Sequence, residues 1–372
     1  MSTPTITVGM DVHKESLVLA VLRGDAAAVE RIDRLPNDLS KLHRYIDRLA
    51  AQGPLRICYE ASGAGYVLQR ALREWGYACE VIAPSLIPTK PGVQRKHDKY
   101  DAAQLARLYR AGELTPVRIP SETEERVRDL VRCRTTFQRE VTKSRHYVVK
   151  FLARRGFIFR EGMHWGRAHV AWLATLARDT SPLAAEDRFV LREYLALLDF
   201  KLQRRIALDR EIEALALTPL FQRPVARLRC FRGLKAHAAM VLASEIGDWQ
   251  RFAHPRQLSA YLGLVPREDS TGPHVRRGSL TKAGNAHCRH VLVQAAWSAR
   301  HRPTVSRELR ARQRGQPPDV IAHAWKAQLR LYKLFRRISA HRPSQIAVVA
   351  VAREFVGFLW AVMRDDPAVA TT

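Results

Sequence analysis

Hydrophobic and polar positions alternate with two different periods in the first part of the chain. Residues 5–22 carry apolar and β-branched side chains at alternate positions on both sides of a polar turn, which predicts two joined strands. Residues 39–52 instead repeat apolar side chains at helical spacing. A strand, a helix and a second strand are predicted further on, over residues 55–63, 64–76 and 77–84. This alternation indicates an α/β domain whose sheet is at least partly parallel.

The pattern changes after Pro120. Residues 122–156 place apolar side chains close to a heptad repeat, at positions 127, 130, 137, 141, 148 and 152. Residues 186–217 form a second long amphipathic segment, so the pair predicts an antiparallel helical arm or coiled coil. Helical segments follow from about Pro219, interrupted by a polar loop at 266–285. We therefore predict three domains, over residues 1–120, 121–218 and 219–372.

The net charge of the chain indicates what kind of partner it binds. The 372 residues contain 62 Lys and Arg against 36 Asp and Glu, a formal charge of +26. Residues 1–120 hold a balance of only +4 and residues 121–372 hold +22. An excess of this size favours a polyanionic partner, most often nucleic acid. A basic protein without such a partner is the alternative, and an anionic membrane surface is less favoured because no amphipathic terminal anchor is visible.

The location of the protein follows from three further features. No run reaches about 18 uncharged apolar residues, so we expect no membrane partner. The first residues lack a basic segment followed by an apolar one, so secretion is not expected. The scattered cysteines argue against a zinc site or a disulfide framework; they are Cys58, Cys79, Cys133, Cys230 and Cys288. These features predict a protein of the reducing cytoplasm.

Four carboxylates occupy positions where an α/β sheet could bring them together. Asp11 lies inside the first predicted strand, and Glu60 lies near the carboxyl end of a later one. Asp98 and Asp101 are three residues apart, hence on one face of a helix. Converging carboxylates repel unless a cation lies among them, and Mg²⁺ prefers such hard oxygen ligands. Taken singly, each acid also has a structural explanation: a turn, a helix cap or a solvated helix face.

Several motifs resemble the IS110 family of bacterial insertion-sequence transposases. They are "GMDVHKES", "CYEASGAGY", "KHDKYDAAQLARL", "LGLVPREDSTG" and "RRGSLTKAGNAHCRHVLVQAAW". The resemblance spans nearly the whole chain, in the order of the family. It implies an α/β RuvC-like (RNase H-fold) N-terminal domain, a long coiled-coil arm and a mostly α-helical C-terminal transposase domain.

The resemblance also implies a chemistry. The acidic tetrad of the family falls on Asp11, Glu60, Asp98 and Asp101, which implies a site for Mg²⁺, with Mn²⁺ as a substitute. Members of the family use a serine of the C-terminal domain to attack DNA phosphate, so the resemblance implies a covalent link between protein and DNA. It also implies a bacterial protein that is associated with the nucleoid. The implied partners are double-stranded DNA at the element ends and target, a structured guide RNA encoded by the element, and further copies of the chain in a dimer or tetramer.

The nucleophile is where this sequence departs from the family pattern. The family places its serine directly before a glycine, and here that stretch is "PREDSTG", with Thr271 before Gly272 and Ser270 one residue earlier. A threonine hydroxyl can attack phosphorus, but it is more crowded and its χ1 angle is stiffer. Ser270, Thr271 or an impaired copy all remain open, and Ser279 is a more distant candidate.

Basic residues surround both candidate sites. Those expected to contact nucleic acid are Arg95, Lys96, Lys99, Arg267, Arg276, Arg277 and Lys282. Residues 228–248 resemble a helix-hairpin-helix, whose turn can hold a DNA backbone. A solvated basic surface is the alternative for each of these residues.

The function that these features favour is a DNA transposase or recombinase with a metal-bound tetrad and a hydroxyl nucleophile. Two alternatives remain. One is a RuvC-like metal-dependent nuclease or junction resolvase that uses water as nucleophile. The other is a non-catalytic protein that binds nucleic acid.

Overall fold

The computed structural model describes residues 4–26, 28–88, 98–268 and 276–364. Five residues named above, Arg95, Lys96, Ser270, Thr271 and Gly272, lie outside this described part. The chain divides into two compact units, Met1–Pro120 and Ser121–Thr372, which are described separately below.

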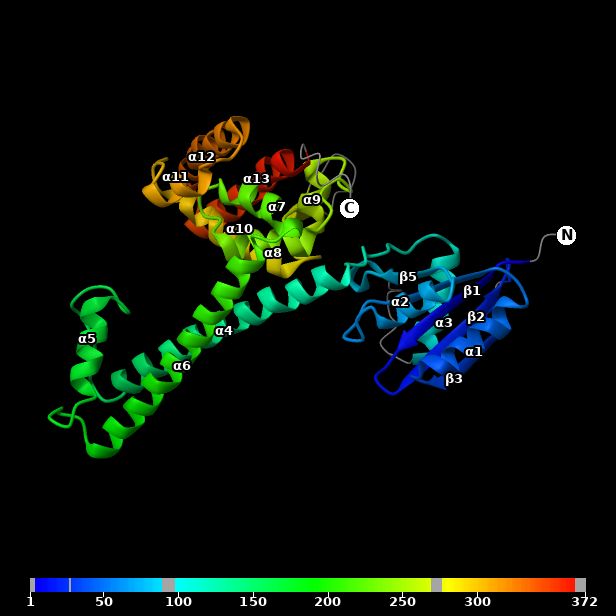
Figure 1. The fold of residues 1–372 in the computed structure, drawn as a ribbon, viewed down its shortest axis with the longest axis horizontal. Coiled ribbons are helices and arrows are strands. Elements are labelled where there is room, and N and C mark those ends of the chain that lie inside the picture. Colours follow the sequence, from blue (N-terminus) through cyan, green and yellow to red (C-terminus); the bar gives the residue numbers. More distant parts are fainter. Residues whose placement is uncertain (1–3, 27, 89–97, 269–275, 365–372) are drawn as a thin grey trace. The chain divides into compact units, whose positions relative to one another are not determined.

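A five-stranded sheet forms the centre of the N-terminal unit (Figure 1). Its strands are Ile6–Val12 (β1), Ser16–Arg23 (β2), Arg31–Pro36 (β3), Leu55–Glu60 (β4) and Cys79–Ile82 (β5). The spatial order is β3-β2-β1-β4-β5, with β2 antiparallel to its neighbours β1 and β3, and with β4 and β5 parallel to β1. This order and these directions fit the RNase H-like fold, as predicted.

Helices cover both faces of this sheet. They are Leu39–Ala50 (α1), Val67–Glu74 (α2) and Asp98–Arg110 (α3), with a short 3-10 turn at Pro84–Leu86 (η1). The apolar sides of α1 and α2 pack with Ile6, Val8 and Met10 of β1 in one core cluster. The opposite face receives α3, whose Ala102 and Ala106 pack against Val18, Ala20 and Leu22 of β2. The sheet is therefore the middle of three layers.

Two long helices begin the second unit and form its arm. They are Glu122–Ala153 (α4) and Ala185–Leu215 (α6), and the shorter Arg167–Leu176 (α5) lies between them in the chain (Figure 1). Ser121 starts α4 with a capping box, since its hydroxyl accepts from the amide of Glu124 while the Glu124 carboxylate accepts from the Ser121 amide.

Ion pairs fix the relative direction of α4 and α6. Arg134 pairs with Asp209 and Arg155 with Asp187, so position advances along one helix as it recedes along the other. The pair is therefore antiparallel, as predicted. In α6 the buried residues are Leu191, Leu198 and Ile212, all separated by multiples of seven. Supercoiling of the two helices remains a prediction.

The remaining helices enclose the largest core of the chain. They are Pro219–Arg229 (α7), Ala236–Ile246 (α8), Pro255–Tyr261 (α9), Ala286–Ala296 (α10), Trp297–Arg300 (η2), Arg307–Gln313 (α11), Pro318–Ser339 (α12) and Ser344–Arg364 (α13). Val127 and Val131 of α4 and Ile212 of α6 join this core, which anchors the arm. Among the described helices α13 alone is long and apolar enough to cross a membrane, yet Val351 and Phe355 on it are buried in the same core.

A small hairpin lies inside the predicted polar loop. Pro266–Glu268 (β6) pairs antiparallel with Arg277–Leu280 (β7). The hairpin differs from the predicted loop because strands of three and four residues carry too little periodicity to be identified from sequence.

Candidate metal centre

The candidate metal centre begins with a close approach between β1 and α3. A Cβ atom added to Gly9 would lie only 2.4 Å from the backbone nitrogen of Ala106 and 2.5 Å from the carbonyl oxygen of Ala102. Only glycine therefore allows α3 to lie this near the strand. Asp11 is two residues further along β1 and so points to the same face of the sheet. Asp98 lies one turn before Ala102, at the start of α3.

This packing brings Asp11 and Asp98 to a common partner. The Nε2 atom of His13 lies 3.1 Å from Asp11 Oδ2 and 3.5 Å from Asp98 Oδ2. One potential ligand atom from each of the three residues lies within 4.8 Å of the others. The Asp11 side chain is 22% exposed and that of Asp98 is 45% exposed, so a solvent-borne ion has access.

The donor set fits a divalent cation. Two carboxylates supply hard oxygen ligands, and an imidazole in contact with both can orient them. Two carboxylates and one imidazole within 4.8 Å also leave coordination positions for water and phosphate oxygens. Asp11 and Asp98 are the residues that would hold the ion most directly.

The other two predicted acids lie near but outside this group. Glu60 ends β4, the parallel neighbour of β1, and the preceding residue Tyr59 pairs with Met10. Glu60 therefore lies next to Asp11 at the same end of these two parallel strands. Asp101 lies on the first turn of α3 with Asp98. Within the described residues, the group of close ligand atoms contains neither Glu60 nor Asp101.

His13 is the member of the site that sequence reasoning missed. It belongs to the motif "GMDVHKES", in which Asp11 is the residue predicted to bind metal. A usable signal existed: His13 follows Asp11 by two residues, and in an extended chain that spacing puts both side chains on one face. Asn37 supports this turn by donating from its side-chain amide to the His13 carbonyl oxygen, at 2.8 Å.

The residues around the predicted nucleophile belong to the other unit. Arg267, Arg276 and Ser279 are exposed beside or on the hairpin strands. Lys282 is also exposed, and its φ of 54° is a left-handed backbone conformation that lysine rarely adopts. Lys99 is exposed on the first turn of α3, and Arg277 is the first residue of β7. Their contacts with nucleic acid remain predictions.

The fit of α3 against Gly9 gives a stability prediction. Gly9→Ala is expected to lower the free energy of unfolding by about 1–3 kcal/mol, because the added methyl meets backbone atoms that cannot move independently. Gly63→Ala is the matched control, since a Cβ there meets nothing within 4 Å, and it is expected to change stability by less than about 0.5 kcal/mol. Urea unfolding of both variants checks this. Equal stabilities would show that α3 does not rest on Gly9.

Comparisons with known proteins agree with this architecture. A family model described as a transposase, of the DEDD type of IS110, matches residues 8–155. A second, described as the transposase IS116/IS110/IS902 family, matches residues 225–311. The y4qE transposase of Sinorhizobium fredii is 37% identical over 361 residues, covering 96% of this chain and 88% of the relative.

Two further proteins show how far the likeness extends. The transposase for insertion sequence element IS1533 of Leptospira borgpetersenii is 30% identical, covering 91% of this chain and 97% of the relative. Among solved structures, T. thermophilus RuvC in complex with a Holliday junction substrate aligns with 12% identity and a TM-score of 0.23, covering 30% of this chain and 99% of the RuvC chain. The RNase H-like assignment rests on the strand order instead.

The class that the sheet and the matches define is a DNA transposase with an RNase H-like, DEDD-type N-terminal domain. Within that class, the chain belongs to the IS116/IS110/IS902 family of transposases, the IS110 family. Membership makes the protein an enzyme that acts on DNA. A DEDD-type domain further indicates dependence on a divalent metal ion.

Proposed function

We propose that this transposase cuts and rejoins DNA with a divalent ion at the acidic site and with a hydroxyl of Ser270 or Thr271 as nucleophile. The observation that carries the proposal is the convergence of ligand atoms of Asp11, His13 and Asp98 within 4.8 Å of one another, at the carboxyl end of β1. Glu60 and Asp101 lie next to them and would complete the tetrad.

Mg²⁺ is the proposed ion, with Mn²⁺ as a substitute. When bound, it would stabilise the negative charge that builds up at the scissile phosphate. Asp11 and Asp98 would hold it, and His13 would orient their carboxylates through its contacts at 3.1 and 3.5 Å. The partial exposure of all three side chains leaves room for a phosphate to approach.

In the first chemical step, the side-chain oxygen would replace a DNA oxygen at the scissile phosphorus. The serine or threonine oxygen forms a phosphoester with the DNA and gives up its proton, while the DNA oxygen on the far side leaves and is protonated. Attack by a DNA hydroxyl on that phosphoester then rejoins the strand and releases the side chain. The two steps conserve the number of phosphoester bonds, so no energy-supplying cofactor is required.

The partners proposed for this reaction are polyanions and further copies of the chain. The balance of +22 over residues 121–372 supports binding of double-stranded DNA and of a structured guide RNA by the second unit. The acidic site belongs to the first unit and the predicted nucleophile to the second. This division is compatible with a homo-oligomer in which one copy supplies the acids and another the hydroxyl.

Withdrawal of the metal tests the proposal. Cleavage of element-end DNA is expected to stop in EDTA and to return with added Mg²⁺ or Mn²⁺, because Asp11 and Asp98 would otherwise repel the phosphate. Binding of the ion should also raise the unfolding temperature of the unchanged protein, through mass action on the folded state. The same rise should be absent from Asp11→Asn. Cleavage that continues undiminished in EDTA would contradict the proposal.

A further inference from the structure

A buried carboxylate lies where the arm joins the rest of the second unit. Glu245 is the penultimate residue of α8 and is only 1% exposed. A buried charge is costly unless it is paired and hydrogen-bonded. Neither the acidic site nor the proposed nucleophile accounts for a charge in this place.

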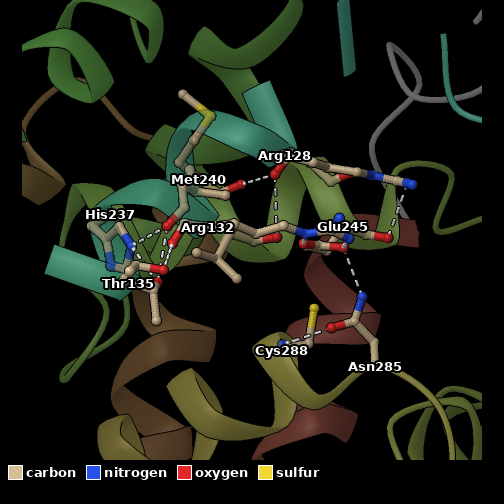
Figure 2. A network of polar contacts seen from close by, with 12 residues as sticks. Arg128, Arg132, Thr135, His237, Met240, Glu245, Asn285 and Cys288 are labelled. Carbon is tan, nitrogen blue, oxygen red and sulfur yellow. Dashed lines mark hydrogen bonds and ion pairs between the residues drawn. The ribbon is translucent and has the colours of Figure 1, made fainter. Parts of the chain in front are cut away.

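Two partners from separate elements satisfy Glu245 (Figure 2). Arg132 of α4 donates from Nε to Oε1 at 2.7 Å and from Nη2 to Oε2 at 3.0 Å. Asn285, immediately before α10, donates from Nδ2 to Oε2 at 2.8 Å. Burial by itself raises the pKa of the Glu245 carboxyl, but Arg132 and Asn285 outweigh it and hold the pKa below its ordinary value. Both carboxylate oxygens of Glu245 therefore have hydrogen-bond donors.

A second arginine strengthens the same joint. Arg128 lies one turn before Arg132 on α4 and is 8% exposed. Its guanidinium donates to the carbonyl oxygens of Ser244 at 2.8 Å and Glu245 at 3.2 Å. These carbonyls are at the end of α8, where backbone oxygens lack helical partners and cations are favoured. Two successive turns of α4, at Arg128 and Arg132, thus form hydrogen bonds with the end of α8 (Figure 2).

Asn285 extends this joint to the segment that follows the hairpin. While its Nδ2 binds Glu245, its Oδ1 accepts from the Cys288 amide at 3.0 Å and caps α10. Close backbone packing surrounds it, since a Cβ on Gly284 would lie 1.9 Å from the Tyr261 carbonyl oxygen. Arg289 closes the segment by donating to the Leu262 and Ala283 carbonyl oxygens at 2.9 and 3.2 Å.

This network is better suited to fixing the relative placement of three elements than to adding to the free energy of unfolding. Apolar side chains of similar size often stabilise a buried contact as well as an ion pair does. The directional hydrogen bonds from Arg132 and Asn285 to the two oxygens of Glu245, by contrast, require one relative placement of their elements. The placement defined here is that of α4, α8 and the start of α10. Only the four residues 281–284 separate β7 from Asn285.

We propose that Glu245 is a positioning residue of the transposase: it fixes the β7–α10 segment against the arm, and the attack on DNA phosphate depends on that placement. This rests on the proposed function, in which the attacking hydroxyl is that of Ser270 or Thr271, which precede β7 in the sequence. Glu245 touches neither DNA nor the reacting atoms in this role. It acts through Asn285 and Arg132.

Two variants separate positioning from folding. Asn285→Ser keeps an oxygen that caps α10 but is too short to reach Glu245. It should unfold close to the temperature of the unchanged protein, bind element-end DNA with similar affinity and form the protein–DNA linkage about tenfold or more slowly at saturating DNA, because small misplacements of reacting groups are costly. Arg126→Ala is the control, since Arg126 lies on the same helix and pairs with Glu122 at an exposed position.

The double variant Arg132→Met with Glu245→Leu gives the decisive comparison. Removing both charges together should restore most of the thermal stability that either single change loses. The rate of linkage should stay low. Recovery of the rate together with stability, or a normal rate in Asn285→Ser, would overturn the proposal.

Asp98→Asn, measured in the same assay, distinguishes the two ideas. If Asp98→Asn is inactive while Asn285→Ser keeps the full rate, the positioning role fails and the proposed function stands. If Asp98→Asn is fully active, the proposed function fails, and the role of Glu245 falls with it.

Discussion

Asp98→Asn is expected to lower cleavage of element-end DNA by at least about a thousandfold, which corresponds to about 4 kcal/mol of transition-state stabilisation. Asparagine keeps the size of the side chain but removes the negative charge that a divalent ion requires. The side chain is 45% exposed, so the exchange buries no unpaired group and should leave folding intact. Cleavage assays at saturating DNA and Mg²⁺ measure the effect.

The substitution should slow the cleavage step and leave DNA binding nearly unchanged. Affinity for DNA is expected to change by less than about threefold, since contacts from basic side chains to phosphate supply most of it. Asp25→Asn is the matched control, because Asp25 is an exposed aspartate of the same unit outside the site. Unchanged cleavage by Asp98→Asn, or an equal loss in the control, would show that Asp98 does not hold the metal.

Removal of the attacking hydroxyl is expected to have an effect of similar size. One of Ser270→Ala and Thr271→Ala should abolish the covalent protein–DNA linkage, with a loss of at least about a thousandfold in recombination. The other should retain most activity, because only one oxygen can attack in line with the leaving oxygen. Gel analysis of denatured reaction mixtures detects the linkage.

Ser279→Ala provides the control for this pair. Ser279 is an exposed hydroxyl on β7, close in sequence to both candidates. It should keep the unchanged rate of linkage. Loss of linkage in Ser279→Ala alone would move the nucleophile to β7, and full activity in all three variants would remove a side-chain hydroxyl from the mechanism.

Much of the N-terminal unit could be predicted from the chain because its signals are local. Alternating apolar residues identified β1 and β2, and helical spacing identified α1. β3 escaped prediction because its residues are half-exposed or exposed at the sheet edge, so it lacks an apolar face. The place of Asp98 next to Asp11 depends on Gly9, whose lack of a side chain allows α3 to approach.

The rest of the site depends on contacts between distant residues. Glu245 and Asn285 look like ordinary polar positions in the sequence, and 40 residues separate them. Arg132 is one of many arginines in the arm, and its 2.7 Å contact with the buried Glu245 distinguishes it from a surface charge. No periodicity records such pairings, so only the folded structure reveals which charges of a basic chain are buried.

Identification of the residue linked to DNA tests the central claim most directly. Protein incubated with element-end DNA and Mg²⁺ is denatured, digested, and its DNA-bound peptide is sequenced by mass spectrometry. We predict a peptide carrying the phosphoester on Ser270 or Thr271, formed by the unchanged protein and absent from Asp98→Asn. Efficient cleavage without any DNA-linked peptide would contradict the account and would indicate a nuclease that uses water.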